Sequence, residues 1–374
     1  MAIEQDAAEI LSGVRRGEAI GSPIALLIHN RDWTNWQYTM SVDANPPTDV
    51  GGAHRPDVTR PRPGHADLSA GLKYGRTDLR DVLERASARE TAARVAVGAI
   101  AKMILREIGI EIASHVTTIG EASLSSTDVV PFSAIASLGD QDDVRCVEAG
   151  CAERMKRAID RARDAGDTIG GAFEVVAHNV PAGLGSHVQW DRKLDGRIAQ
   201  AMMSIPAIKA VGLGLGTEVG HLPGSQVHDE IRLRESIPGI DSGNRPRDGN
   251  RPRDESDEGT VPGISRPTNR AGGLEGGVTN GQDVRVTAWM KPISTLMKPL
   301  RSVDLASMTE SPAAIERSDV CAVPAAAVVG EAMLAITLAE AVLEKFGGDT
   351  VADLRAAWQH YTASLETRLG GGKP

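Results

Sequence analysis

"VCAVPAAAVVGEAMLAITLAEAVL", residues Val320–Leu343, is the longest apolar stretch of the chain and decides where its core lies. Pro324 suits the first turn of a helix, and Gly347–Gly348 mark a helix end. A lipid-facing span is disfavoured because Glu331 and Glu340 interrupt the stretch and carboxylates are costly in hydrocarbon. The sequence therefore predicts a helix buried inside a protein core.

Segments on either side of this helix show shorter strand and helix patterns. The predicted elements are a hairpin at 10–28, helices at 87–108, 148–165 and 194–203, and strands at 170–181 and 283–292. Strands and helices occur in blocks and do not alternate strictly. We therefore expect an α+β fold and not a doubly wound parallel sheet.

The composition of the 374 residues is that of a globular protein, with 41% hydrophobic and only 3% aromatic residues. The net charge of -9 argues against a nucleic acid or a membrane surface as the main partner. Cys146, Cys151 and Cys321 are too few for a disulfide framework and too scattered for a zinc site. We expect reduced thiols, a cytoplasmic location and no metal.

One segment differs in composition from the rest of the chain. Residues 241–267 contain a tandem copy, "GNRPRD" followed by "GNRPRD", and almost no residue able to enter a core. This pattern predicts a flexible surface insertion. We expect the whole chain, 1–374, to form a single domain with a disordered tail at 367–374.

The stretch "ERASARETAARVAVGAIAK", residues 84–102, predicts a helix with arginines at its start. Ser87 and Glu90 match a capping box, which places free backbone amides beside Arg85 and Arg89. Amides, helix dipole and guanidinium groups together favour a phosphate or carboxylate site. Small apolar residues further along predict that the helix packs deeply and draws its first turn inward. The alternative is that both arginines pair with neighbouring glutamates on a solvated face.

Upstream, "RPRPGHAD" brings a histidine close to two arginines and a carboxylate. The prolines keep Arg60 and Arg62 in extended backbone, and Gly64 gives His65 room for close approach to a ligand. His65 beside Asp67 has the chemistry to donate a proton near neutral pH. The alternative is a histidine with a purely structural role.

Three further stretches carry groups suited to an anionic or flat ligand. The glycines of 268–282 predict either backbone amides lying against a ligand or a cluster of tight turns. Lys291–Thr295 sets a cation and two hydroxyls at a strand end, and Arg317 and Asp319 precede the core helix. A dinucleotide site is not supported, because "GLGLGTEVG" lacks the third glycine of that motif.

Taken together, these stretches resemble the chorismate synthase family. The resemblance rests on long motifs in one collinear order: "RPRPGHAD", "RASARETAARVAVGAIAK", "PAGLG", "AMMSIPAIK", "GSQVHDEI", "NRAGGLEGGVTNGQ", "KPIST" and "RSDVCAVPAA". It covers the chain except the 241–267 insertion and the C-terminal tail.

The resemblance implies a lyase that converts 5-enolpyruvylshikimate 3-phosphate to chorismate and phosphate in aromatic amino-acid biosynthesis. It implies reduced FMN as cofactor, with NADPH as the reductant used by some members, and a homotetramer. The implied fold is a β-α-β sandwich of two antiparallel sheets with helices, here without its first strand and helix. The phosphorylated substrate would supply the anion for the arginines.

The resemblance also implies roles for residues that match family motifs. His65 and Asp319 match the family's acid and its assisting aspartate. The flavin-binding residues implied are Arg85, Ala86, Ser87, Gly276, Lys291, Pro292, Ile293, Ser294, Thr295 and Arg317. We add Arg60, Arg89, His228 and Asp229 as candidates for the substrate pocket.

The chain departs from the family at its start. Family members open with Gly-Glu-Ser-His-Gly, whose histidine is a second acid, and with an anion-binding arginine segment, whereas this chain begins "MAIEQDAAEILSGVRRG". We therefore expect a start placed too late or a truncation, with low activity and stability for the chain as written. The alternatives are a non-catalytic remnant that still binds flavin, and a phosphate-ligand binding protein without chemistry.

Overall fold

The computed structural model describes residues 6–45, 54–125, 129–139, 141–233, 259–316 and 318–369. The chain groups into two compact units, each assembled from three segments, whereas we predicted one domain. Unit 1 comprises Met1–Ala96, Ala165–Thr168 and Ile293–Asp319, and unit 2 comprises Val97–Asp164, Ile169–Pro292 and Val320–Pro374.

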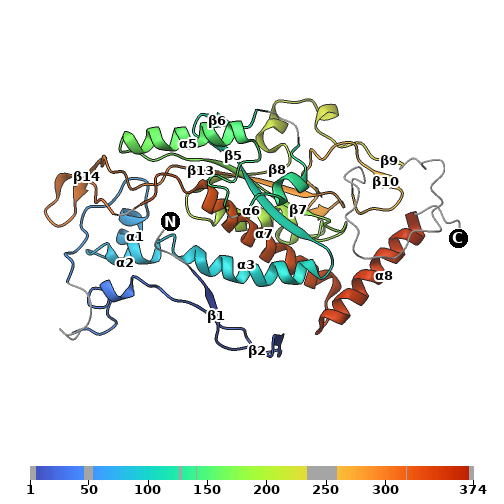
Figure 1. The fold of residues 1–374 in the computed structure, drawn as a ribbon, viewed down its shortest axis with the longest axis horizontal. Helices are drawn as coiled ribbons and strands as arrows, with labels where there is room; N and C mark the ends of the chain where they lie inside the picture. The colour runs from blue at the N-terminus through green and yellow to red at the C-terminus, as the bar shows by residue number, and fades with distance from the viewer. Residues whose placement is uncertain are drawn as a thin grey trace. The chain divides into compact units, whose positions relative to one another are not determined.

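Unit 2 is built on one five-stranded antiparallel sheet in the order β6-β5-β7-β13-β8 (Figure 1). Its strands are β5 (Glu111–Ile119), β6 (Ala122–Ser123), β7 (Gly171–His178), β8 (Ile208–Leu213) and β13 (Val284–Met290). The strands predicted at 170–181 and 283–292 are confirmed as β7 and β13. Runs of β-branched and small apolar residues favour these extended segments and fill the space around them.

Helix α7 (Val323–Phe346) packs along β5 and β7 and against α6 (Leu194–Met203). A side chain at Gly330 would meet Phe173 at 2.7 Å and Val175 at 2.9 Å, so a glycine is required where α7 crosses the sheet. α7 is long and apolar enough to span a membrane by length and composition, but 72% of its most apolar window is buried in the structure. The predicted core helix is confirmed, with Pro324 in its first turn and Gly347 at its end.

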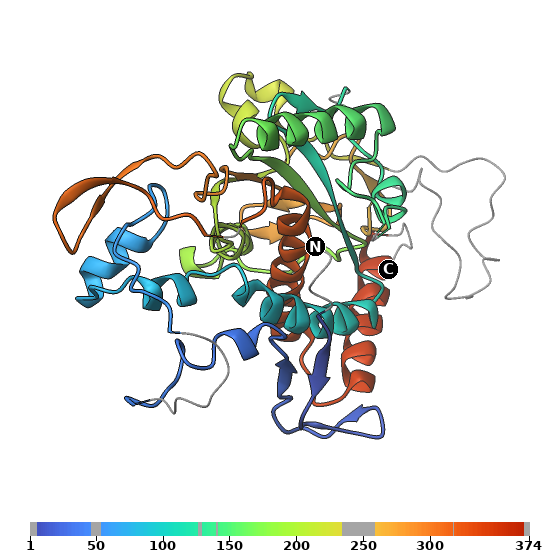
Figure 2. The ribbon, with the colours of Figure 1, turned by 60° about the vertical axis from the view of Figure 1, so that its left-hand side comes forward.

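The other helices of unit 2 surround this core (Figure 2). α5 (Ala149–Asp164) lies against β5 and β6, and its own Cys151 is completely buried. The remaining elements of unit 2 are α4 (Phe132–Ala136), α8 (Val351–Leu369), β9 (Arg232–Leu233), β10 (Ile264–Ser265), β11 (Leu274–Glu275), β12 (Val278–Thr279) and the 3-10 helices η2 (Trp190–Arg192), η3 (Gly216–Gly220) and η4 (Gly224–Gln226).

Unit 1 consists of hairpins and short helices. β1 (Ala8–Ile10) pairs with β4 (Leu26–Ile28), and β2 (Val14–Arg15) pairs with β3 (Glu18–Ala19), which confirms the hairpin predicted at 10–28. Its other elements are η1 (Trp33–Asn35), α1 (Asp67–Tyr74), α2 (Arg80–Arg85), β14 (Arg301–Asp304) and β15 (Thr309–Pro312). α3 (Glu90–Arg106) begins in unit 1 and continues in unit 2.

The α+β class is therefore confirmed, and every strand pair among the described residues is antiparallel. The described residues form one five-stranded sheet and five two-stranded ones. The helices predicted at 148–165 and 194–203 are confirmed as α5 and α6.

Two predicted boundaries need correction. Residues 367–369 are the last turn of α8 and not part of a tail, while 370–374 lie outside the described residues. Of the predicted insertion, 241–258 lies outside the described residues. Ile264 and Ser265 form β10, which pairs with β9, because they can add to an existing edge although their neighbours are polar.

Candidate functional site

The candidate site lies in unit 1, at the turn that leads into α1, where titratable side chains are hydrogen-bonded to one another beside a cavity. Gly64 has φ +79°, a left-handed conformation that L side chains rarely adopt, and the His65 amide donates to the Arg62 carbonyl at 3.2 Å. α1 then begins at Asp67, whose carboxylate sits in the first helical turn where the dipole favours negative charge. This turn folds the side chains of residues 62, 65 and 67 towards one another.

We call the resulting set Arg62, His65, Asp67 and Thr295 the site network. Asp67 Oδ1 lies 2.5 Å from His65 Nδ1, and Asp67 Oδ2 accepts from Arg62 Nε at 2.9 Å and from the Arg62 amide at 3.0 Å. Arg62 Nη1 donates to Thr295 Oγ1 at 2.8 Å, which ties the turn to a segment 233 residues away. Asp67 is completely buried, Arg62 is 9% exposed and the His65 side chain is 23% exposed.

The charge state of Asp67 follows from these contacts. Burial alone would raise its pKa, but hydrogen bonds from His65 and Arg62 outweigh burial and hold the pKa of Asp67 well below its usual range. The carboxylate is therefore ionised at neutral pH. It balances the Arg62 guanidinium and leaves His65 as the accessible titratable group of the site network.

A cavity of about 530 Å³ opens beside His65. The turn and α1 form one wall and β14 the other; the lining residues are Pro61, Arg62, Pro63, Gly64, His65, Leu68, Ser69, Leu72, Arg301, Ser302 and Val303. The β14 wall is fixed to the turn because Ser302 Oγ donates to the Pro61 carbonyl at 2.5 Å. No described residue forms an ion pair with Arg301, so the cavity presents a cation and an imidazole to a ligand.

The predicted anion site at the start of α3 is built differently from the expectation. The helix begins at Glu90 and not at Ser87, because the backbone before it forms tighter turns, in which the Glu90 amide donates to the Ser87 carbonyl at 3.3 Å. The Glu90 side chain pairs with Arg94 at 2.8 Å, one turn further along α3. Ser87 Oγ instead accepts from the Arg89 amide at 3.2 Å. Ala86, next to it, is half-buried at the end of α2.

The two arginines of this segment also differ from the expectation of burial. Arg85 is exposed, so α3 does not draw it inward. Arg89 is half-buried and pairs with Asp6 at 2.6 Å, while its other terminal nitrogen donates to the His29 carbonyl at 3.2 Å. Neither arginine pairs with Glu84 or Glu90 among the described residues, so the alternative of local pairing is wrong as well.

The remaining unit 1 candidates are Arg60, Asp319 and the end of the Lys291–Thr295 stretch. Arg60 is exposed, and its carbonyl accepts from Ala314. Asp319 is exposed, and within the described residues no hydrogen bond joins it to His65. The Ile293 carbonyl accepts from Thr168 Oγ1 at 2.6 Å, next to Ser294. Arg317 lies outside the described residues.

The other candidates belong to unit 2. Gly276 has φ +61° in the turn between β11 and β12, with open space where a side chain would stand. Lys291, which precedes Pro292, has its pKa lowered by partial burial and by the charge of Lys209. His228 is exposed.

Asp229 has a structural role that accounts for its position. Its carboxylate accepts from Thr268 Oγ1 at 2.5 Å and from the amides of Arg270 at 2.8 Å and Ala271 at 2.9 Å. These three bonds hold the start of the glycine-rich stretch 268–282. The carboxylate is thus occupied by this stretch, and its role in the substrate pocket stays a prediction.

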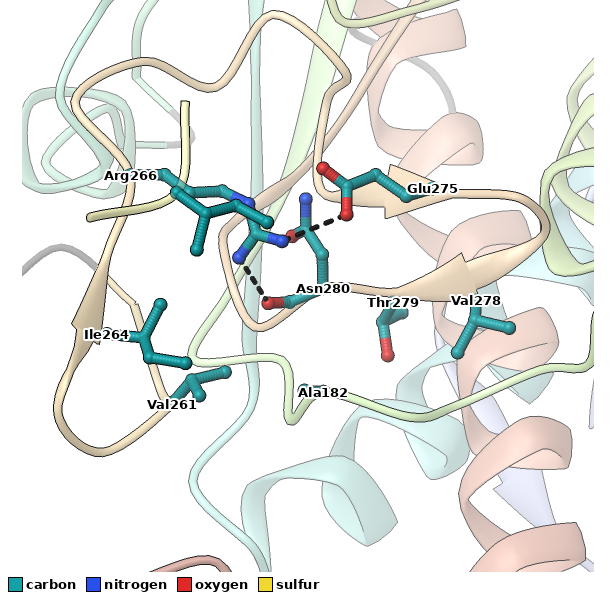
Figure 3. Close-up of a pocket in the computed structure, with 9 residues that line it drawn as sticks. Ala182, Val261, Ile264, Arg266, Glu275, Val278, Thr279 and Asn280 are labelled. Carbon is teal, nitrogen blue, oxygen red and sulfur yellow. Dashed lines mark hydrogen bonds and ion pairs between the residues drawn. The ribbon is translucent and has the colours of Figure 1, made fainter. Parts of the chain in front are cut away.

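A second cavity of about 320 Å³ lies beside the β11–β12 hairpin in unit 2 (Figure 3). Its aliphatic walls include Ile231, Val261 and Ile264. Arg266 is the cation at its rim, but Glu275 binds that guanidinium at 2.9 Å and the Asn280 carbonyl accepts from it at 3.4 Å. This cavity therefore suits a phosphorylated ligand less well than the cavity beside His65.

Three residues of the site, Arg62, Asp67 and Arg301, were not predicted as site residues from the sequence. The spacing Arg-x-x-His-x-Asp over 62–67 was the available signal for the first two. Arg301 carried no signal, because only the pairing of β14 with β15 and the contact of β14 with the turn bring it to the cavity.

Comparisons with known proteins agree with the motifs. The family model described as chorismate synthase matches residues 1–343. The chain is 52% identical to a protein of Moorella thermoacetica named chorismate synthase over 98% of this chain and 87% of that protein. It is 48% identical to one of Koribacter versatilis with the same name, again over 98% and 87%.

A solved structure gives the same result for the fold. The crystal structure of a chorismate synthase matches with a TM-score of 0.71 and 41% identity, covering 97% of this chain and 85% of that one. These matches extend over almost the whole of this chain. They give no support to the alternative of a non-catalytic remnant or to the expected inactivity.

Proposed function

The chain belongs to the chorismate synthase family, and we propose that it catalyses the 1,4-elimination of phosphate from 5-enolpyruvylshikimate 3-phosphate to give chorismate. The observation that carries this proposal is the identity of about half of all residues with named chorismate synthases along nearly the whole chain. The site network adds an accessible histidine beside a cavity that also contains a cation.

The substrate class fits this cavity. The reaction removes a phosphate and a ring hydrogen from a molecule that also carries two carboxylates, so its binding site needs positive charge. Arg301, an exposed residue of β14 that lines the same cavity as His65, supplies such a charge. We assign His65 the role of an acid, because Asp67 holds Nδ1 at 2.5 Å, whereas the nearest protein contact of Nε2 is Arg62 Nη2 at the longer distance of 3.5 Å.

The donor set of the chain also fits reduced FMN. A flavin phosphate needs cations and hydroxyls, and the half-exposed Lys291 has its pKa lowered partly by neighbouring Lys209, a repulsion that a bound phosphate would relieve. Arg85, Ala86 and Ser87, Gly276, Lys291–Thr295 and Arg317 are the residues that we propose hold the cofactor. When bound, reduced FMN supplies the electron density that assists departure of phosphate.

Asp319, Arg60, Arg89, His228 and Asp229 retain the roles implied by resemblance only as proposals. Asp319 and Arg60 are exposed in unit 1, which leaves them accessible to a ligand. Arg89 and Asp229 are already paired, so a substrate contact would have to share or displace their present partners. Each residue is changed to alanine and the KM for the substrate is measured. This measurement separates residues that contact the substrate from residues that only hold their present partners.

The elimination itself is tested with the whole chain under nitrogen. Purified protein is mixed with 5-enolpyruvylshikimate 3-phosphate and dithionite-reduced FMN, and chorismate absorbance and released phosphate are followed together. We expect equal amounts of the two products, and none when flavin is omitted. Substrate that stays intact with reduced flavin present would refute the proposal.

We also propose a cytoplasmic homotetramer whose flavin is reduced by NADPH or by a separate reductase. Exposed apolar side chains on the unit 1 hairpins, such as Ile10, Leu11 and Ile20, support association between copies. Light scattering after gel filtration tests the assembly. Anaerobic bleaching of FMN by NADPH in the presence of the chain tests flavin reduction.

A further inference from the structure

Asp67 has every acceptor position of its carboxylate occupied. Oδ1 faces His65 Nδ1 at 2.5 Å and Arg62 Nη2 at 3.2 Å, and Oδ2 faces Arg62 Nε at 2.9 Å and the Arg62 amide at 3.0 Å. The residue is completely buried and starts α1. Its orientation is therefore set by the fold before any ligand binds.

This arrangement determines which nitrogen of His65 carries a proton. An ionised carboxylate only accepts hydrogen bonds, so the 2.5 Å contact requires a proton on His65 Nδ1. Arg62 Nη2 also lies 3.1 Å from His65 Nδ1, but both nitrogens carry protons and two donors cannot bond each other. Arg62 Nη2 donates to Asp67 Oδ1 instead. The other ring nitrogen, Nε2, lies 3.5 Å from Arg62 Nη2 and is then the one that gains or loses a proton.

Arg62 in turn is held by a hydrogen bond to Thr295. Its Nη1 donates to Thr295 at 2.8 Å, and the guanidinium is 9% exposed. A guanidinium cannot lose its proton in proteins, so it stabilises the Asp67 charge at every pH of interest. The order of support runs from Thr295 to Arg62, to Asp67 and to His65.

We propose that Asp67 is a positioning residue for the reaction: it fixes His65 with the proton on Nδ1 and leaves Nε2 as the nitrogen that exchanges a proton. The catalytic consequence rests on the proposed function. The tautomer of His65 does not, and it is measured independently of activity. Arg62 and Thr295 support Asp67 in this role.

The test uses Asp67→Asn in the full chain, because asparagine keeps the size and presents an NH₂ group where the carboxylate accepted. We expect kcat to fall by about 10²-fold or more while KM for the substrate changes by less than about threefold. The matched control is Asp283→Asn, which breaks a similar contact at 2.7 Å between Asp283 Oδ1 and His178 Nδ1 outside the site. It should leave kcat unchanged.

Two readouts distinguish positioning from a general structural role. In the ¹⁵N spectrum of histidine-labelled protein, with His65→Gln used for assignment, wild-type His65 should show a protonated Nδ1, and Asp67→Asn should lose that signature. The alkaline limit of the pH-rate profile should move to lower pH in Asp67→Asn. The charged groups around the ring are then Arg62 and, on the facing wall, Arg301.

Each outcome decides the proposal. A wild-type His65 protonated on Nε2 with Nδ1 bare overturns it, even if Asp67→Asn does not fold. A folded Asp67→Asn with wild-type kcat, or with low kcat but unchanged His65 shifts, also overturns it. If the wild-type chain forms no chorismate, the proposed function fails, while the ¹⁵N measurement still reports on Asp67.

Discussion

Among the described residues, two groups that each combine a histidine, a carboxylate and an arginine differ in their access to a ligand. The site network places His65, 23% exposed, beside a cavity. A second group, which we call the sheet network, joins His115 of β5, Glu174 of β7 and Arg285 of β13 across neighbouring strands, with His115 only 1% exposed. In the sheet network Glu174 accepts from His115 Nε2 at 2.9 Å and from Arg285 Nη2 at 3.0 Å.

The carboxylates of both networks have pKa values below their usual range. For Glu174, burial acts in the opposite direction, and the hydrogen bond from His115 with the charge of Arg285 prevails. A lowered carboxylate pKa therefore does not identify the reactive site. The difference is that a ligand has a cavity at His65, whereas strands surround His115.

The largest expected effect on stability comes from breaking the sheet network. Glu174→Gln leaves the Arg285 charge buried without its counter-ion, and we expect a loss of about 3–5 kcal/mol in the free energy of unfolding. Denaturant titration followed by circular dichroism measures it. A loss below about 1 kcal/mol would show that the sheet network does not stabilise the fold.

A smaller effect is expected when the site network loses its outermost support. Thr295→Val removes the hydroxyl that accepts from buried Arg62, and we expect a loss of about 1–3 kcal/mol. Thr295→Ser keeps the hydroxyl and serves as the control in the same unfolding measurement. Equal stability of the two variants would mean that the hydroxyl contributes nothing.

The pH dependence of stability sharpens the comparison. Because the folded-state pKa of Glu174 is lowered from its ordinary value of 4.5, its contribution to stability is complete above that pH and is lost as the pH falls through the lower folded-state pKa. Each unit of pKa difference corresponds to about 1.4 kcal/mol. The difference in the free energy of unfolding between wild type and Glu174→Gln, measured from pH 7 to pH 3, should become smaller as the pH falls. A difference that grows at low pH would contradict the lowered pKa of Glu174.

The smallest effect is expected at a third pair, His178 and Asp283, which is neither buried like the sheet network nor next to the cavity beside His65. Its side chains are 35% and 23% exposed. Asp283→Asn should therefore change the free energy of unfolding by less than about 1 kcal/mol in thermal or urea unfolding. A larger change would place this pair with the sheet network.

The sequence was sufficient for elements with local signals. The core helix begins near Pro324 and ends at Gly347 in the structure, as the sequence predicted. α6 has the predicted limits 194–203. The start of α3 was misplaced, because the Glu90 side chain pairs with Arg94 and not with Ser87 as the predicted capping box required. Local patterns therefore located elements better than they located the side-chain pairs at their ends.

The site was predictable only in part, for a related reason. His65 and Asp67 are two residues apart, so their contact follows from a tight turn. Thr295 lies 233 residues from Arg62, and Asp6 lies 83 residues from Arg89, so those pairings depend on the tertiary fold. The resemblance named His65 but contained no information on which groups hold it.

The claim that His65, and not His115, takes part in the reaction is tested most directly by the rate of chorismate formation by two variants assayed in parallel, His65→Gln and His115→Gln. Both are measured anaerobically with reduced FMN, at equal concentrations of folded protein. We expect kcat of His65→Gln to fall by about 10²–10⁴-fold, whereas kcat per folded molecule of His115→Gln should stay near wild type. Equal losses in the two variants, or a loss confined to His115→Gln, would contradict it.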